Sequence, residues 1–165
     1  MVDEFNQKVE SNDSINILLV EDNEADVKIT IRAFAKVKLK NKIYVVNDGA
    51  EALDFIYHQG QYRDEEKFPT PDLILLDIKL PKVDGFQVLE KIKGDLEYNF
   101  IPVIMLTSSR NEEDVARSYS GGAASFIPKP VSYEQFVKVV EGFTFYWRMI
   151  NKLPSSKTKA KRKKT

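Results

Sequence analysis

Five short, mostly apolar runs punctuate this sequence, and segments with helical spacing of apolar side chains separate them. The runs are residues 15–20, 43–46, 73–76, 101–106 and 124–127. Strands that are apolar on both faces are typical of a parallel sheet covered by helices on each side. Strands alternating with helices through right-handed crossovers favour a doubly wound arrangement. We therefore predict an α/β fold, a (βα)5 three-layer sandwich with a five-stranded parallel sheet.

The segments between the runs predict helices with recognisable ends. Asn23 and Asp84 stand where N-caps are expected, and glycines follow the fourth helix. In the first helix Val27, Ile31 and Phe34 have the spacing of one buried face. The helices are expected within residues 21–38, 48–57, 84–94, 110–122 and 132–150.

The length of 165 residues fits one domain, which we place at 15–153 between a flexible N-terminus (1–14) and a disordered basic tail (154–165). The absence of cysteine excludes disulfides, thiolate nucleophiles and cysteine-based metal sites. No apolar run approaches the ~18 residues of a membrane span, and the N-terminus has no signal-peptide pattern. We expect a cytoplasmic protein that does not enter membranes.

The formal net charge of zero conceals an asymmetry. The last nine residues hold six of the 25 basic residues and no acid, so residues 1–156 carry 19 basic against 25 acidic groups, a net charge of −6. An acidic body disfavours nucleic-acid binding, whereas the tail can make weak polyanion contacts.

Polar residues follow four of the predicted strands where a parallel sheet places its ligands. They are Glu21, Asp22, Asp77, Thr107 and Lys129. Three neighbouring carboxylates repel each other unless a cation neutralises them, and Mg²⁺ is a hard cation that prefers oxygen ligands. The lysine supplies a charge for a phosphoryl oxygen and the threonine a hydroxyl donor. This edge of the sheet is therefore a candidate site for Mg²⁺ and a phosphoryl group.

Over about residues 15–150 the chain resembles the receiver domain of two-component response regulators, a flavodoxin-like receiver fold. The matching stretches are LLVEDN (18–23), LILLDIKLPKVDGFQVL (73–89), PVIMLTSS (102–109) and GGAASFIPKP (121–130). The long loop before the third strand and the aromatic last helix are most similar to the stand-alone, single-domain regulators associated with bacterial phytochromes. The resemblance thus implies a phosphorelay protein that signals by conformational switching and protein–protein interaction.

The resemblance also implies roles for individual residues. Asp77 would accept a phosphoryl group from a sensor histidine kinase, which in the phytochrome-associated group is a phytochrome-type kinase. Asp22, Asp77 and the Lys79 backbone carbonyl would bind Mg²⁺ directly, and Glu21 would act through a bound water. Glu21 stands where an aspartate is commoner, so its water contact differs by one methylene.

Two further roles concern the phosphorylated state. Thr107 would hydrogen-bond the phosphoryl group and Lys129 would pair with it. Phe126 would be the rotameric switch residue, at a position where many members carry tyrosine. Plain core packing is the alternative for Phe126.

Three other functions fit these residues less well. Mg²⁺-dependent aspartyl-phosphate phosphatases share a strand-end aspartate nucleophile, but they place a second aspartate where this chain has Lys79. A flavodoxin-like cofactor carrier is disfavoured because the acidic turn after the first strand repels phosphate. A receiver that takes no phosphate would lack Asp77 or Lys129. We expect no enzymatic activity beyond self-catalysed phosphotransfer and slow autodephosphorylation.

Three features remain beside the site. His58 is expected on the surface, and the loop 58–70 is a solvated connection or, alternatively, a partner contact. Phe145, Tyr146 and Met149 exceed what the core face of the last helix needs, which predicts a homodimer through that helix and the fifth strand.

Overall fold

One five-stranded parallel sheet organises the computed structural model, which describes residues 14–36, 40–108, 111–128, 134, 137, 138, 141 and 142. The strands are β1 (Ile15–Val20), β2 (Asn41–Val46), β3 (Leu73–Asp77), β4 (Val103–Thr107) and β5 (Ser125–Pro128). Their order is β2-β1-β3-β4-β5. The chain therefore places β2 on one side of β1 and the later strands on the other side, so the topological switch point lies between β1 and β3. The predicted doubly wound topology is confirmed.

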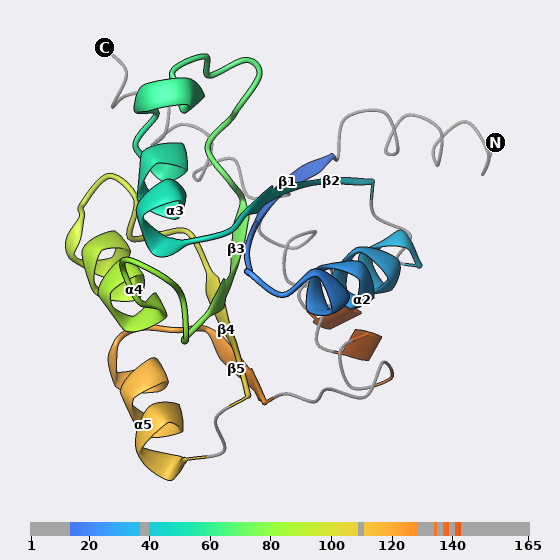
Figure 1. The fold of residues 1–165 in the computed structure, drawn as a ribbon, viewed down its shortest axis with the longest axis vertical. Helices are drawn as coiled ribbons and strands as arrows, with labels where there is room; N and C mark the ends of the chain where they lie inside the picture. Colours follow the sequence, from blue (N-terminus) through green and yellow to red (C-terminus); the bar gives the residue numbers. More distant parts are fainter. Residues whose placement is uncertain are drawn as a thin grey trace, which may run out of the picture.

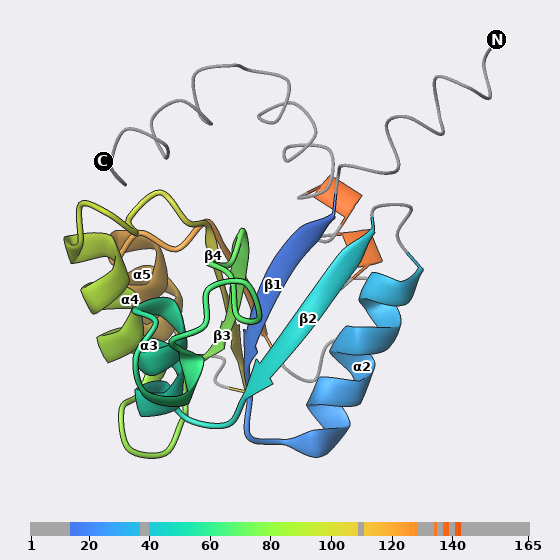
Figure 2. The ribbon, with the colours of Figure 1, turned by 90° about the horizontal axis from the view of Figure 1, so that it is seen from above.

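Helices cover both faces of the sheet (Figure 1). They are α2 (Glu24–Ala35), α3 (Gly49–Ile56), α4 (Gly85–Gly94) and α5 (Glu112–Ser120), with a short 3₁₀ turn η1 (Gly60–Tyr62). Figure 2 shows α3, α4 and α5 on one face and α2 on the other, which confirms the three layers. Within the described ranges, every helix is too short or too polar to cross a lipid bilayer.

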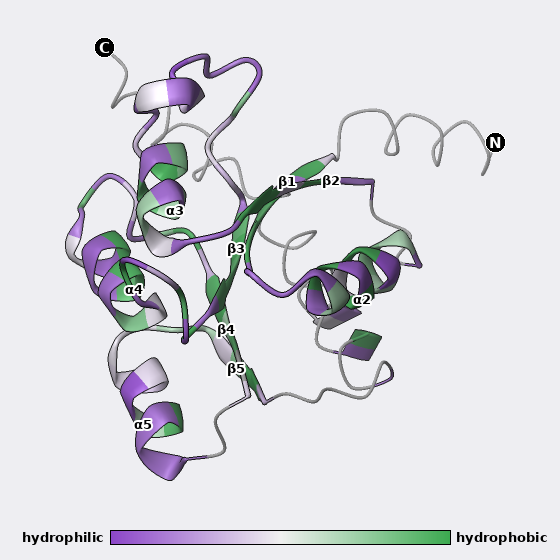
Figure 3. Cartoon of the chain, viewed as in Figure 1, coloured by the Kyte–Doolittle hydropathy of each residue, from purple (hydrophilic) through white to green (hydrophobic). Residues whose placement is uncertain are grey.

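The core is divided by the sheet into two apolar clusters. Leu18, Leu76 and Met105 face α3 and α4, whereas Leu19 and Leu75 face α2 and pack with its Phe34. This division follows from the alternation of side chains along each strand. Figure 3 shows the resulting apolar centre between more polar helix surfaces.

One helical face differs from its prediction. In α2 the buried side chains are Thr30, Ala33 and Phe34, and Ile31 is 42% exposed. The threonine is tolerated inside because its hydroxyl donates to the Asp26 carbonyl at 2.9 Å. The spacing of apolar residues placed Ile31 on the buried face of this helix, and that prediction was wrong.

The start of β4 also differs from its prediction. The strand begins at Val103 and not at Ile101, because Pro102 has no backbone N–H to offer the ladder. The boundaries of the other four strands agree with the predicted ones to within two residues, whereas α2 ends three residues earlier than predicted.

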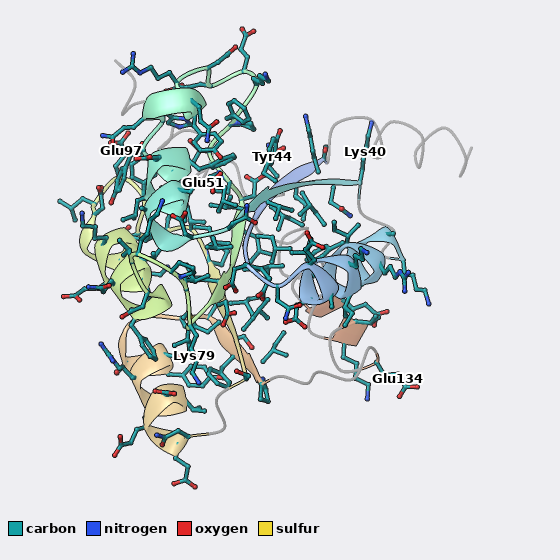
Figure 4. All side chains as sticks on the ribbon, in the orientation of Figure 1. Lys40, Tyr44, Glu51, Lys79, Glu97 and Glu134 are labelled. Carbon is teal, nitrogen blue, oxygen red and sulfur yellow. The ribbon has the colours of Figure 1, made fainter. Side chains whose placement is uncertain are left out.

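The loop 58–70 is held against the domain by aromatic side chains. Tyr62 and Phe68 pack with Phe55 of α3, at ring-centroid distances of 5.0 and 5.9 Å, and Tyr44 of β2 joins them. The Tyr62 hydroxyl donates to Glu51, which Figure 4 shows on α3. Two aromatic side chains therefore anchor the loop to the domain, while residues 59–61 and 63–67 are exposed as in a solvated connection.

His58 lies in the same region and is half-buried. Its φ is +55°, and its Nε2 lies 3.0 Å from the Thr70 hydroxyl at the far end of the loop. The contact joins the two ends of the loop 58–70, so this partly buried histidine also has a structural contact that the sequence did not predict.

Three sequence predictions lie wholly or mainly outside the described residues. These are the flexible N-terminus 1–14, the basic tail 154–165 and most of the last helix. Val137 lies within that predicted helix and packs against the α2-side core cluster.

Candidate functional site

Three carboxylates converge at the carboxyl ends of β1 and β3. Glu21 and Asp22 follow β1, and Asp77 is the last residue of β3; the two strands are hydrogen-bonded neighbours with Val20 opposite Leu76. One carboxylate oxygen from each residue lies within 4.8 Å of the others. Glu21 and Asp77 are 1% and 7% exposed, whereas Asp22 is open to solvent.

The backbone fixes the first two of these acids. The Glu21 amide donates to the Val46 carbonyl at 3.0 Å, which continues the pairing of β1 with β2 by one residue. The Asn23 amide donates to Glu21 Oε1 at 3.1 Å, and Asn23 Oδ1 accepts from the Asp26 amide as the N-cap of α2. The turn that starts α2 thereby also orients the buried Glu21 carboxylate.

Asp77 is held by the loop that follows it. The Lys79 amide lies 3.3 Å from Asp77 Oδ1, and Lys79 itself extends beyond the end of β3 (Figure 4). The Gly85 amide donates to the Ile78 carbonyl at 2.8 Å. The loop 78–84 therefore folds back onto the strand end instead of leaving the site.

The N-terminus of α3 supports the other side of that loop. A Cβ on Gly49 would lie 1.8 Å from the Val83 carbonyl oxygen, so only glycine permits this approach. The Gly49 amide lies 3.5 Å from the Pro81 carbonyl oxygen, and Lys82 Nζ lies 3.5 Å from Asp48 Oδ2. Sequence analysis missed this support, and Gly49 directly after the Asp48 N-cap was the available signal.

The donor set fits a hard divalent cation. Carboxylate oxygens that all lie within 4.8 Å of one another can share one ion, which would offset the mutual repulsion of the acids. Two of the acids are buried, so the repulsion is less screened than on an open surface. These observations support the predicted metal-ligand role of Glu21, Asp22 and Asp77.

The other predicted site residues are placed only partly. Thr107 ends β4, opposite Pro128 of β5, and its side chain lies outside the described part. Lys129 follows Pro128 and also lies outside the described residues. Phe126 is half-buried, pairs with Met105 and packs against the core on the α3 side. Its roles in packing and in switching both remain compatible with this position.

Known proteins resemble this chain over most of its length. The model of the response regulator receiver domain matches residues 17–141. The probable methanogenesis regulatory protein FilR2 of Methanothrix harundinacea is 39% identical over 88% of this chain and 92% of its own length. The response regulator Rcp1 of Synechocystis is 37% identical over 89% of this chain and 98% of its own.

Solved structures agree with these relatives. The Mn²⁺-bound form of Rcp1 superposes with a TM-score of 0.70 at 37% identity and covers 81% of this chain and 94% of its own. The phosphorylated cyanobacterial phytochrome response regulator RcpA gives 0.73 at 37% identity and covers 86% and 99%. With its strand order and acidic strand ends, the chain belongs to the response regulator receiver family of two-component signalling.

Proposed function

We propose that this chain is a cytoplasmic, stand-alone response regulator that accepts a phosphoryl group on Asp77 from a sensor histidine kinase of the phytochrome type. The observation that carries the proposal is the meeting of Glu21, Asp22 and Asp77 within 4.8 Å at the carboxyl ends of β1 and β3. The phosphorylated chain would signal by conformational switching and by binding a protein partner.

In the transfer step an Asp77 carboxylate oxygen attacks the phosphorus of a phosphohistidine. The P–N bond breaks, its electron pair stays with the imidazole nitrogen, and an acyl phosphate forms on Asp77. Such a reaction depends on alignment and charge neutralisation more than on covalent help from side chains. The Lys79 amide, 3.3 Å from Asp77 Oδ1, contributes to holding the carboxylate in place.

Mg²⁺ would be held by Asp22, Asp77 and the Lys79 backbone carbonyl, with Glu21 acting through a bound water. When bound, the ion supplies positive charge that neutralises the carboxylates and the phosphoryl oxygens. The buried, hydrogen-bonded Glu21 carboxylate supports this division of roles, because Asn23 already holds one of its oxygens.

The new phosphate adds roughly 1.5–2 negative charges at neutral pH. Lys129 would pair with it and Thr107 would hydrogen-bond it, leaving space beside β4 for Phe126. The half-buried Phe126 ring opposite Met105 supports a rotameric change of this kind. The Mn²⁺-bound form of Rcp1 and the phosphorylated form of RcpA support both parts of the proposal by relationship.

Phosphotransfer profiling tests the proposal. Each histidine kinase of the source organism is autophosphorylated with labelled ATP and mixed with the chain and Mg²⁺ for short times. We expect rapid transfer from one or a few kinases, abolished by chelator and by Asp77→Asn. Glu90→Gln, an exposed acid on α4, is the matched control and should accept phosphate normally. Absence of transfer from every kinase, or transfer that survives Asp77→Asn, contradicts the proposal.

A further inference from the structure

A groove of about 620 Å³ lies between α3 and α4, on the outer face of the domain. Leu53 of α3, Val83 of the loop 78–84 and Gly94 of α4 give it an apolar part. Asp54 of α3 and Asp95 at the C-terminus of α4 give it two carboxylates, against the single cation of Lys91 on α4. The groove can therefore accept an extended segment with aliphatic stems and cationic ends, as lysine and arginine have.

Further negative charge surrounds one end of this groove. Tyr57 lines the groove, and its ring packs edge-on against Tyr98 with centroids 5.3 Å apart. Burial raises the pKa of the Tyr98 phenol, and the negative charges of Glu97, Asp95 and Glu65 raise it further. Glu65 belongs to the loop 58–70, so acids from that loop and from the segment after α4 gather beside the groove.

The same face carries the charge imbalance of the domain. Residues 48–67 and 84–97, which form α3, the first part of the following loop, and α4, contain ten acidic and four basic residues. Their net charge of −6 equals that of the whole of residues 1–156, so the remainder is balanced. A cationic segment is thus attracted to the side of α3 and α4, which carries the net negative charge of residues 1–156.

The chain supplies such a segment itself. Residues 157–165 hold six basic residues and no acid, which matches the charge of the α3–α4 side. From Ile150, where the sequence predicts the last helix to end, the remaining fifteen residues can extend about 50 Å. A domain of this size has a radius of gyration of about 14 Å, so the tail can pass from one face to the other.

We propose that the basic tail, residues 157–165, binds in the groove between α3 and α4 of the same chain. Covalent linkage gives the tail an effective concentration of about a millimolar at the groove, an advantage over any separate basic protein. The bound tail contacts Val83, and so the loop that follows Asp77. The inference depends on charge and shape alone and stands apart from the proposed phosphoryl transfer.

Paramagnetic labelling tests the binding of the tail in the groove. A single introduced cysteine can carry the label, because the chain has no cysteine of its own. Ala160→Cys in the full-length chain takes one nitroxide, and the broadening of backbone amide signals is measured by NMR at low salt. We expect the strongest broadening at Leu53, Asp54 and Gly94. It should disappear near 1 M salt, where the Debye length falls to about 3 Å.

Charge variants separate the groove from general attraction. Asp54→Asn with Asp95→Asn should lower the binding constant of the tail about fivefold, seen as weaker broadening at Leu53 and Gly94. Glu112→Gln with Glu113→Gln, two exposed acids of α5, removes the same charge elsewhere and should leave the broadening unchanged. Equal broadening over all acidic surfaces, or broadening that ignores Asp54 and Asp95, overturns the proposal.

A mixing experiment distinguishes the chain's own tail from other occupants. Spin-labelled protein without ¹⁵N is mixed with unlabelled ¹⁵N protein. Broadening of Leu53 and Gly94 only in the fully labelled single species supports binding within one chain. Equal broadening in the mixture means that a second copy provides the tail. Groove broadening seen only after a separate spin-labelled basic peptide is added means that another protein fills the groove. Both of these results overturn the proposal.

Discussion

Gly85 stands so close to the end of β3 that a Cβ on it would lie 2.2 Å from the Asp77 carbonyl oxygen. The same residue donates its amide to Ile78 and begins α4 behind the Asp84 N-cap. The helix start and the end of β3 are therefore one packed unit, and the position of the Asp77 carboxylate depends on the absence of a side chain at residue 85.

Gly85→Ala is expected to lower the free energy of unfolding by about 2–4 kcal/mol, because backbone atoms and not a flexible side chain must move. Gly94→Ala, at the end of the same helix, meets nothing within 4 Å and should be neutral or stabilising by up to about 1 kcal/mol. Urea unfolding of both variants measures the difference. Equal stabilities of the two variants would show that the close approach at Gly85 is not a constraint.

Asp22→Asn should raise the thermal stability measured in chelator and remove most of the Mg²⁺ affinity. It takes one charge from three carboxylates within 4.8 Å of each other, a relief on the order of 1 kcal/mol. Differential scanning calorimetry with and without Mg²⁺ gives both quantities, and Glu90→Gln serves as control. An unchanged or lower melting temperature for Asp22→Asn in chelator argues against an acidic pocket with this repulsion.

Tyr62 makes stability depend on alkaline pH. Burial, followed by the hydrogen bond to Glu51 and nearby carboxylates, raises the pKa of its phenol far above 10.0. The folded state then holds this proton more tightly than the unfolded state, so its contribution is complete below pH 10 and is lost as the pH rises above it. Tyr62→Phe should cost about 1–2 kcal/mol at pH 7 and reduce the decline above pH 10.

Urea unfolding between pH 7 and 11 measures this slope. Tyr119→Phe is the control, since that ring is 51% exposed. Tyr57 and Tyr98 also have raised pKa values, because both are partly buried beside acids, so some decline should persist in Tyr62→Phe. If the unfolding free energy of Tyr62→Phe falls above pH 10 as steeply as that of wild type, the protonated Tyr62 hydroxyl does not stabilise the folded state.

A homodimer through the last helix and β5 remains a prediction, because Phe145, Tyr146 and Met149 lie outside the described residues. Burying three such side chains contributes about 1.5–3 kcal/mol each, much of it offset by lost rigid-body freedom, so micromolar affinity is expected. Sedimentation analysis over a concentration series, with the double variant Phe145→Asp/Tyr146→Asp, checks this. A wild-type monomer at all concentrations contradicts the dimer; an equally dimeric variant contradicts its location.

The sheet and the acidic cluster were predictable because both follow from periodicity and from strand ends. Short apolar runs predict parallel strands, and Glu21, Asp22 and Asp77 meet because β1 and β3 are neighbours. Ile31 was misassigned because a threonine whose hydroxyl bonds within its own helix can replace an apolar residue in the core. Such exchanges depend on local geometry that a hydropathy pattern does not contain.

Contacts between segments distant in sequence were also beyond prediction. The aromatic packing of Tyr62 and Phe68 on Phe55 gives the loop 58–70 its structure, although its glycine and prolines indicate a loop. The approach of Gly49 to Val83 depends on how α3 docks beside the loop 78–84. Neither pair has a periodic signature, so only the folded chain reveals them.

The site of phosphorylation tests the central claim most directly. The chain is incubated with a small acyl-phosphate donor and Mg²⁺, and the modified residue is mapped by mass spectrometry under conditions that preserve acyl phosphates. The account predicts one phosphoryl group on Asp77, none in chelator and none in Asp77→Asn. Acid-stable phosphate on another residue, or full labelling of Asp77→Asn, would contradict it.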